Sequence, residues 1–362
     1  MALGTWPSTP LVKARQRCHD ARCQLEAGID PQDQRDQVIR EATTLSDVTE
    51  GYGSVETLFQ LYIANLQRQD KRSWHEQKRS LDLDALPVLG AATPCRGVTP
   101  DQIREILHRL ISRGAAVQSN RIHSYLHTAF EFARLYDNDP RQLKTGLKFA
   151  LEKNPVADVP KDTSAEHAGE RVLSWDELAK IWNDPLLEQP AQQAIRLILA
   201  TGGQRPGEIT EAAWSEFDFN TCFWILPAQR ARKADRDHLI PLNPFISEIL
   251  MSIRVLDPES TWLFPACPGT KADRPWGKSK LPHIIRSYCK LADMTPWVPR
   301  DLRRTAKTLM RELGVSKFDR DRIQNHAIND VSGQHYDRYD YLEEKRKGLD
   351  LWCGRLERIS KS

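Results

Sequence analysis

The sequence predicts a multidomain, mainly α-helical protein, in which a helical bundle precedes a mixed α+β domain with a small antiparallel sheet. The chain has 362 residues, more than a single hydrophobic core usually organises. Apolar residues recur at helical spacing through residues 54–158. Two segments in the C-terminal half, 217–227 and 238–242, are rich in aromatic and β-branched residues and predict strands.

The N-terminal half is predicted to be helical after an initial linker. Apolar spacing predicts a helix over residues 10–27, and the polar stretch 31–53 predicts a linker. Ser54 is the expected N-cap of the next helix. Further helices are expected over about 74–90, from Thr99 with Pro100 in the first helical position, and over 119–136. The domain predicted from these elements covers residues 51–158, and a small, polar linker follows over 159–172.

Residues 173–362 are predicted to form a second domain. It opens with Ser174 and Glu177, which have the spacing of a capping box. A basic loop joins the two predicted strands. Helices are expected over 189–200, 208–214, 244–254, 278–292, 300–313, 317–325 and 342–359.

Charge is balanced over the whole chain but not locally. The net charge is only +3, from 52 basic and 49 acidic residues, and does not by itself indicate a nucleic-acid partner. Residues 300–322, however, carry eight basic and four acidic side chains. Such an excess of positive charge could bind the phosphate backbone of a nucleic acid. From charge alone, an ordinary solvated helix surface is an equally good interpretation.

Several classes of protein are disfavoured by composition. No apolar run approaches the ~20 residues of a membrane span, and the N-terminus has no basic segment followed by an apolar one. The seven cysteines are scattered without a C-x-x-C pair. We therefore expect a cytoplasmic protein with reduced thiols, without a zinc site or a disulfide framework.

An ordered set of side chains suggests chemistry on a phosphodiester. Two arginines, Arg205 and Arg303, can each present a planar fork to phosphate oxygens. Arg205 lies at a predicted helix entrance with Glu208 one turn on, and Arg300 shares a face with Arg303.

The remaining members of the set provide a proton donor, a second phosphate contact and a nucleophile. Lys233 on the basic loop can protonate a leaving oxygen, and His326 can donate to phosphate or exchange protons with it. Tyr336 follows ten residues later and can attack phosphorus. Taken singly, each has an ordinary structural or surface role as an alternative, and Tyr339 and Tyr341 are alternative tyrosines.

The same segments resemble the tyrosine recombinases, specifically the integrases of satellite phages and genomic islands. The matching runs are A-T-G-G-Q-R-P-G-E-I at 200–209, R-K-A-D-R-D-H-L-I-P-L at 232–242, P-R-D-L-R-R-T at 299–305, L-G-V-S-K-F-D-R-D-R-I-Q-N-H at 313–326 and Y-D-R-Y-D-Y-L-E-E-K-R at 336–346. Residues 51–158 resemble the core-binding domain of this family, and residues 1–50 resemble the end of its arm-type DNA-binding domain plus a linker.

The resemblance implies a site-specific DNA recombinase that integrates or excises a mobile element through a 3′-phosphotyrosyl intermediate. It implies that Tyr336 is the nucleophile, Arg205 and Arg303 clamp the phosphate, Lys233 is the leaving-group acid and His326 assists. It also implies a homotetramer on paired attachment core sites, without metal or cofactor, and with DNA-bending and excisionase proteins as accessory partners. The C-terminal helix is expected to pack on a neighbouring subunit.

Two departures from the family pattern bear on activity. Arg300 occupies the position of the usual histidine, and an arginine cannot serve as a base near neutral pH. Much of the arm-type domain is not represented, so we expect weakened recognition of arm sites with core-site cleavage retained. The alternatives are a catalytically impaired relative that acts as a sequence-specific DNA-binding protein, and a relaxing topoisomerase of the same chemistry.

Overall fold

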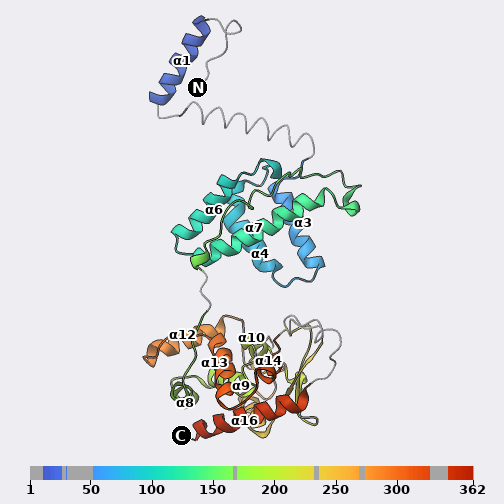
Figure 1. Ribbon diagram of the computed structural model, residues 1–362, viewed down its shortest axis with the longest axis vertical. Coiled ribbons are helices and arrows are strands. Elements are labelled where there is room, and N and C mark those ends of the chain that lie inside the picture. Colours follow the sequence, from blue (N-terminus) through green and yellow to red (C-terminus); the bar gives the residue numbers. More distant parts are fainter. Residues whose placement is uncertain are drawn as a thin grey trace. The chain divides into compact units, whose positions relative to one another are not determined.

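The computed structural model describes residues 11–26, 30, 52–165, 169–231, 236–268, 274–326 and 341–361. The chain divides into two compact units, unit 1 over Met1–His167 and unit 2 over Ala168–Ser362 (Figure 1). Each unit has its own hydrophobic core. No helix among the described residues is long and apolar enough to cross a membrane.

All named elements of unit 1 in the part that the structure describes are helical. Its elements are α1 (Leu11–Glu26), α3 (Val55–Arg68), α4 (Trp74–Ser80), the π-helical turn η1 (Leu81–Ala85), α5 (Leu86–Leu89), η2 (Cys95–Gly97), α6 (Pro100–Ser112), α7 (Ala116–Tyr136), η3 (Pro140–Gln142) and η4 (Thr163–Ala165). The long helix α7 contacts α3, α4 and α6. Local capping signals define two of the helix starts: Ser54 accepts a hydrogen bond from the Thr57 amide, and Thr99 forms a capping box with Gln102.

The chain beyond residue 158 continues to pack on unit 1. Val159 is buried in the core, and its carbonyl lies 2.6 Å from Nε2 of His123 on α7. Asn120 donates to the carbonyl of Asp162 and accepts from the amide of the same residue. Residues 159–162, which the sequence placed in the linker, are therefore fixed against α7.

Unit 2 combines helices with a small sheet. Its elements are α8 (Trp175–Asn183), α9 (Gln189–Ala200), α10 (Pro206–Thr210), η5 (Trp214–Glu216), β1 (Phe217–Asp218), β2 (Phe223–Leu226), β3 (His238–Pro241), α11 (Pro244–Leu256), α12 (Lys280–Leu291), α13 (Pro299–Glu312), α14 (Lys317–Ile323) and α16 (Leu342–Ser360). The sheet is antiparallel in the order β1-β2-β3, with Trp224 opposite Ile240. The predicted small antiparallel sheet and mainly helical class are thus confirmed.

Two predicted elements of unit 2 were wrong in extent. The helix expected over 208–214 is the short α10, which ends at Thr210, and Ala213 instead forms a β-bridge to Trp262. The strand expected over 217–227 is two strands, β1 and β2. The chain turns between them because the Asp218 carboxylate accepts from the amides of Asn220 and Thr221.

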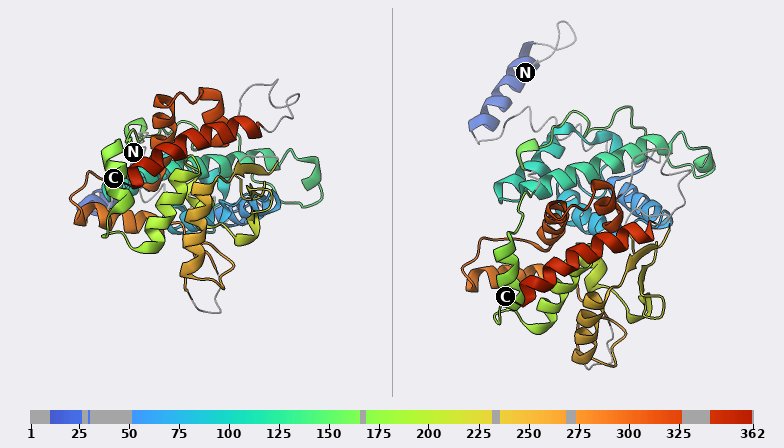
Figure 2. Two further views of the ribbon diagram at one scale, coloured as in Figure 1. Left: turned by 90° about the horizontal axis from the view of Figure 1, so that it is seen from below. Right: turned by 60° about the horizontal axis from the view of Figure 1, so that its bottom comes forward.

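The last helix, α16, is part of the core of unit 2 and runs along its own domain (Figure 2). Trp352 is fully buried, and its indole Nε1 donates to the carbonyl of Leu199 on α9 at 2.7 Å. Leu349 and Leu356 lie in the same cluster. Trp352, Leu349 and Leu356 of this helix are thus buried within its own chain, and the packing on a neighbouring subunit that the resemblance implied stays a prediction.

Candidate active site

The site is built on the turn that follows α9. Gly202 and Gly203 have φ values of 75° and 80°, the left-handed region that favours glycine. A Cβ at Gly203 would lie 2.9 Å from Cα of Arg303, so this turn and α13 approach backbone to backbone. The turn therefore places Arg205 beside Arg303, although the two residues are 98 positions apart in the sequence.

Arg303 is a buried cation held by main-chain oxygens. Only 8% of the surface of this residue is exposed to solvent. Nη1 donates to the carbonyl of Gly203 at 2.8 Å, and Nη2 donates to the carbonyl of Gln324. Burial first, and then the neighbouring charge of Arg205, lowers the pKa of Arg303 to about 10. The guanidinium is therefore still charged at neutral pH.

Arg205 is held at the start of α10, as the sequence predicted. Nη1 pairs with Oε1 of Glu208 at 2.7 Å, one turn along α10. Nη2 donates to the carbonyl of Asn325 at 3.1 Å. Glu208 is nearly fully buried, so this pair fixes the direction of the Arg205 fork.

The two arginines thus donate to consecutive carbonyls, those of Gln324 and Asn325, and the next residue is His326. Two buried glutamines hold this turn in place. Gln204 donates to the carbonyl of Ile323 at 2.6 Å, and Gln324 donates to the carbonyls of Gly202 and Arg303, both at 2.9 Å. The structure therefore brings together three of the predicted site residues, Arg205, Arg303 and His326.

His326 lies in a cluster of charged side chains. Its Nδ1 is 2.9 Å from Oδ1 of Asp321 and 3.0 Å from Nζ of Lys307. Lys307 and Asp321 also form an ion pair. Burial lowers the pKa of His326, the Asp321 hydrogen bond opposes this change, and the charges of Arg303 and Lys307 reinforce it. The net effect favours the neutral imidazole at neutral pH.

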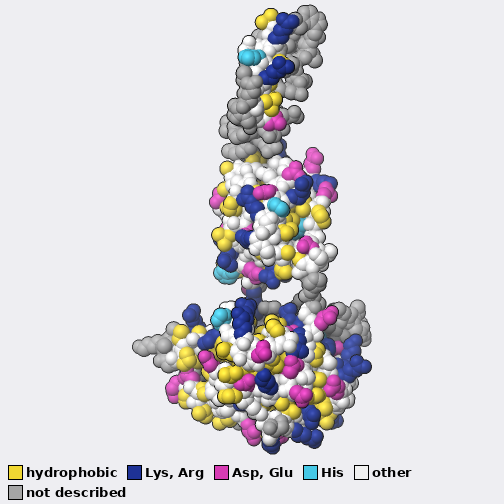
Figure 3. Space-filling view, turned by 90° about the vertical axis from the view of Figure 1, so that its left-hand side faces the viewer, with side chains coloured by type: hydrophobic (Ala, Val, Ile, Leu, Met, Phe, Trp, Pro, Cys, Tyr) yellow, Lys and Arg dark blue, Asp and Glu magenta, His cyan; other side chains and the backbone are white. Residues whose placement is uncertain are grey.

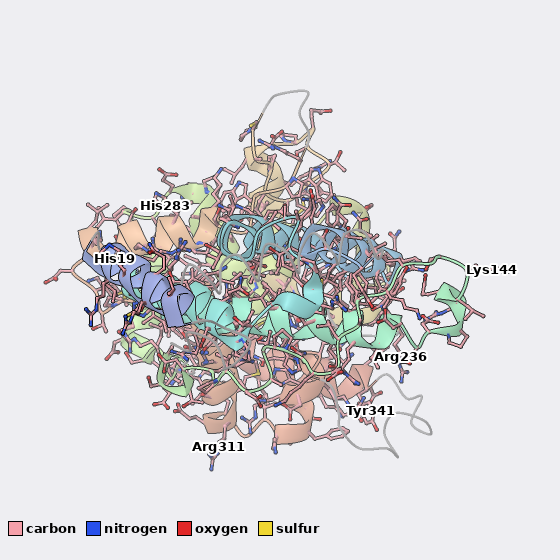
Figure 4. All side chains as sticks on the ribbon, turned by 90° about the horizontal axis from the view of Figure 1, so that it is seen from above. His19, Lys144, Arg236, His283, Arg311 and Tyr341 are labelled. Carbon is pink, nitrogen blue, oxygen red and sulfur yellow. The ribbon has the colours of Figure 1, made fainter. Side chains whose placement is uncertain are left out.

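The remaining predicted residues are placed differently. Arg300 is exposed in the first turn of α13, and its charge contributes to lowering the pKa of Arg303. Lys233 and Tyr336 lie outside the described residues. The alternative tyrosine Tyr341 is described at the start of α16 (Figure 4). Its ring packs edge-on against Phe318, and the guanidinium of Arg322 lies 4.1 Å from its centroid.

The base of the loop that carries Lys233 is tied to the arginine site. Arg230 donates to the carbonyl of Glu208 on α10 and to the carboxylate of Glu216. On the other side of the loop, buried His238 lies 3.1 Å, through Nε2, from the carbonyl of Ile323. Both ends of the loop are thus anchored to elements that hold Arg205 and His326.

The basic segment 300–322 does not form one free basic face. Arg304 pairs with Asp301, and Lys307 pairs with Asp321. Basic and acidic side chains are interspersed over the face shown in Figure 3. Within the described ranges, no group of three or more His, Cys, Asp or Glu side chains is arranged to hold a metal ion.

Sequence reasoning missed five residues that organise the site: Gln204, His238, Lys307, Asp321 and Gln324. Two of them had a local signal. Lys307 lies four residues after Arg303 on the same helix face, and Asp321 lies five residues before His326. The contacts of Gln204 and His238 with residue 323 join segments more than 80 residues apart, so the linear sequence contains no comparable signal.

Comparisons with known proteins identify one matching family model and several similar chains. Residues 172–341 match the family model of the phage integrase family. The chain is 24% identical over 373 residues to prophage integrase IntA of Escherichia coli K12, covering 97% of this chain and 80% of that protein. It is 22% identical over 382 residues to the integrase of Enterobacteria phage P4, covering 99% of this chain and 80% of that one.

Solved structures show the same fold at low sequence identity. A lambda integrase tetramer bound to a Holliday junction matches with a TM-score of 0.61 and 16% identity, over 91% of this chain and 87% of that one. The structure of a dimer of lambda integrase residues 75–356 bound to a core site also matches. Its TM-score is 0.57 and its identity 16%, over 79% of this chain and 99% of that one. Residues 172–341 therefore form a domain that matches the phage integrase family. Over nearly its whole length, the chain is similar to integrases of phages and prophages.

Proposed function

We propose that the protein is a site-specific DNA recombinase that cleaves and rejoins DNA through a 3′-phosphotyrosyl link to Tyr336. The observation that carries this proposal is the pair of guanidiniums on consecutive carbonyls immediately before His326. Two fixed, charged forks side by side suit the two non-bridging oxygens of one phosphodiester.

The roles of the six residues follow from what each can do chemically. Arg205 and Arg303 bind the scissile phosphate, and Arg300 adds positive charge at the exposed entrance of α13. Lys233 protonates the departing 5′ oxygen, and this role is supported by the contacts of the flanking residues Arg230 and His238 with Glu208 and Ile323. His326 exchanges a proton at the reacting centre.

Tyr336 is the preferred nucleophile. Tyr341 is constrained at the start of α16 by Phe318 and Arg322, which supports a different tyrosine as the attacking group. We further propose that the chain acts on DNA core sites as a homotetramer. The lambda integrase tetramer on a Holliday junction, which has the same fold, supports this arrangement.

The test uses duplex DNA that carries the core site with a nick next to the scissile phosphate. Cleavage then releases a short fragment, and the covalent protein–DNA adduct accumulates and is resolved on a denaturing gel. We expect an adduct with the wild-type protein, none with Tyr336→Phe, and an undiminished adduct with Tyr339→Phe and Tyr341→Phe. An adduct that persists in Tyr336→Phe refutes the assignment of the nucleophile.

A specific observation favours a second candidate function, a DNA-binding protein without cleavage. Arg300 stands where a base would be expected, and arginine does not lose its proton near neutral pH. This candidate predicts a footprint on the core site but no covalent adduct from the wild-type protein. The same gel, combined with a footprint of the same DNA, therefore separates the two functions.

A further inference from the structure

Lys307, Asp321 and His326 form a triangle beside the phosphate site, and we argue its role on the basis of the proposed function. Nδ1 of His326 lies 2.9 Å from a carboxylate oxygen of Asp321 and 3.0 Å from the ammonium nitrogen of Lys307. The same carboxylate oxygen accepts from Lys307. The three groups are between about a fifth and a third exposed, so they are partly shielded from water.

The contact with Asp321 favours one of the two ring nitrogens as the carrier of the proton in the neutral imidazole. Asp321 and His326 belong to one turn, closed by a hydrogen bond of 2.9 Å from the His326 amide to the Asp321 carbonyl. If Nδ1 were unprotonated, its lone pair would face a lone pair of Oδ1 of Asp321 at 2.9 Å, which is repulsive. A protonated Nδ1 instead donates to the carboxylate at an ordinary distance.

Lys307 is compatible with a proton on Nδ1, because its ammonium is at the end of a flexible side chain on α13 and can reorient. Its protons can be directed to Asp321 and to solvent, so it does not need the Nδ1 lone pair. Its positive charge opposes the charge of Asp321, which would otherwise favour the imidazolium.

The other charged groups near the ring act in the same direction as Lys307 or are already paired. Arg303 on α13 adds positive charge and disfavours the imidazolium. Arg205, the residue before α10, donates to the carbonyl of Asn325 next to His326 and is paired with Glu208. Among the described elements around His326, Asp321 is the carboxylate in direct contact with the ring.

We propose that Lys307 and Asp321 are positioning residues that together define the state in which His326 enters the reaction. Asp321 keeps the proton on Nδ1, and Lys307 keeps the ring neutral. Nε2 then has a free lone pair, and His326 acts as a proton acceptor rather than as a donor to phosphate.

The resulting step is balanced. Nε2 takes the proton of the Tyr336 hydroxyl as its oxygen forms a bond to phosphorus. The bond from phosphorus to the 5′ oxygen breaks, and that oxygen receives a proton from Lys233. Rejoining reverses each transfer.

The test reads His326 directly in the full chain without DNA, so it does not depend on cleavage. Protein with ¹⁵N-labelled histidine is examined by two-bond ¹H–¹⁵N spectroscopy, which distinguishes protonated from unprotonated ring nitrogens. His326→Gln assigns the signals. In the wild-type protein at about pH 8, where an ordinary imidazole is neutral, we expect the proton on Nδ1. A proton on Nε2 overturns the proposal.

Two variants change the ring in different ways. Lys307→Met leaves Asp321 unopposed, so the pKa of His326 should rise in an NMR titration. Asp321→Asn removes the carboxylate and leaves an ammonium facing Nδ1, so the proton should move to Nε2. Lys317→Met removes the same charge from an exposed position of α14 and should change neither property. An unchanged His326 pKa in Lys307→Met refutes the role of the lysine.

An activity measurement adds a second readout. In Lys307→Met, the acidic limb of the pH profile for adduct formation should move to higher pH, because a larger fraction of His326 is protonated and cannot accept a proton. A uniform loss at all pH values contradicts the positioning role. If no wild-type adduct forms, the proposed function fails, while the NMR result still decides the state of His326.

Discussion

Replacement of Gly203 by alanine tests the close approach of the α9 turn to α13. The residue has φ of 80°, and an added Cβ would meet Cα of Arg303 and Nε2 of Gln324, each at 2.9 Å. The left-handed conformation costs about 1–2 kcal/mol for a residue with a side chain. The contact with backbone costs about 1–3 kcal/mol more, because Arg303 cannot rotate away. We therefore expect Gly203→Ala to lower the free energy of unfolding by about 2–5 kcal/mol.

Thermal unfolding followed by calorimetry measures this effect. For a domain the size of unit 2, about 1 kcal/mol corresponds to about 2–4 °C in Tm. The expected decrease is therefore about 4–20 °C in the transition of unit 2. The matched control is Gly207→Ala, because a Cβ there would meet nothing within 4 Å and the residue lies within α10.

Gly207→Ala should be neutral or slightly stabilising, since alanine favours a helix by about 1 kcal/mol over glycine. If Gly203→Ala is as stable as Gly207→Ala, the turn does not pack on α13 as described. The carbonyl of Gly203 also accepts from Arg303, so the same substitution should reduce adduct formation.

Three further substitutions test other parts of unit 2. Trp352→Ala should cost about 3–5 kcal/mol in urea unfolding, because it removes a fully buried indole and its hydrogen bond to Leu199. Arg303→Lys should slow adduct formation by about 10²–10³-fold, because one ammonium cannot reproduce a fork held by two carbonyls. His238 should destabilise the fold in acid. Burial lowers its pKa to about 3, so between about pH 6.5 and 3 the unfolded chain binds a proton that the folded chain does not. Between pH 7 and pH 5 it should contribute a loss of about 2 kcal/mol, which urea unfolding of His238→Asn should no longer show.

Each of these has a control within the same domain. Leu351→Ala, next to Trp352 but 56% exposed, should have little effect on unfolding. Arg311→Lys, whose side chain points outward from the last turn of α13, should leave the rate unchanged (Figure 4). Equal losses in a variant and its control, or the same pH dependence with and without His238, would contradict the reasoning.

The local features of the fold could be predicted from sequence. The caps at Ser54, Thr99 and Ser174 form as expected because a cap depends on residues within one turn. The pairing of Arg205 with Glu208 was predicted for the same reason.

Features that depend on distant contacts could not be predicted. The helix expected to continue to residue 214 ends early because Ala213 bridges to Trp262, almost 50 positions away. The role of Gln324 depends on carbonyls of Gly202 and Arg303, which only the folded chain brings together. The position of Lys307 beside His326 likewise required the packing of α13 on α14.

The direct acceptors of Arg303 are uncharged oxygens of the main chain. The guanidinium is therefore held in a fixed orientation, and no carboxylate bound directly to it neutralises its charge. This site should attract small oxyanions in the absence of nucleic acid. Sulfate or inorganic phosphate in a storage buffer would compete for the same forks, so the choice of buffer anion should influence how readily the protein engages its target.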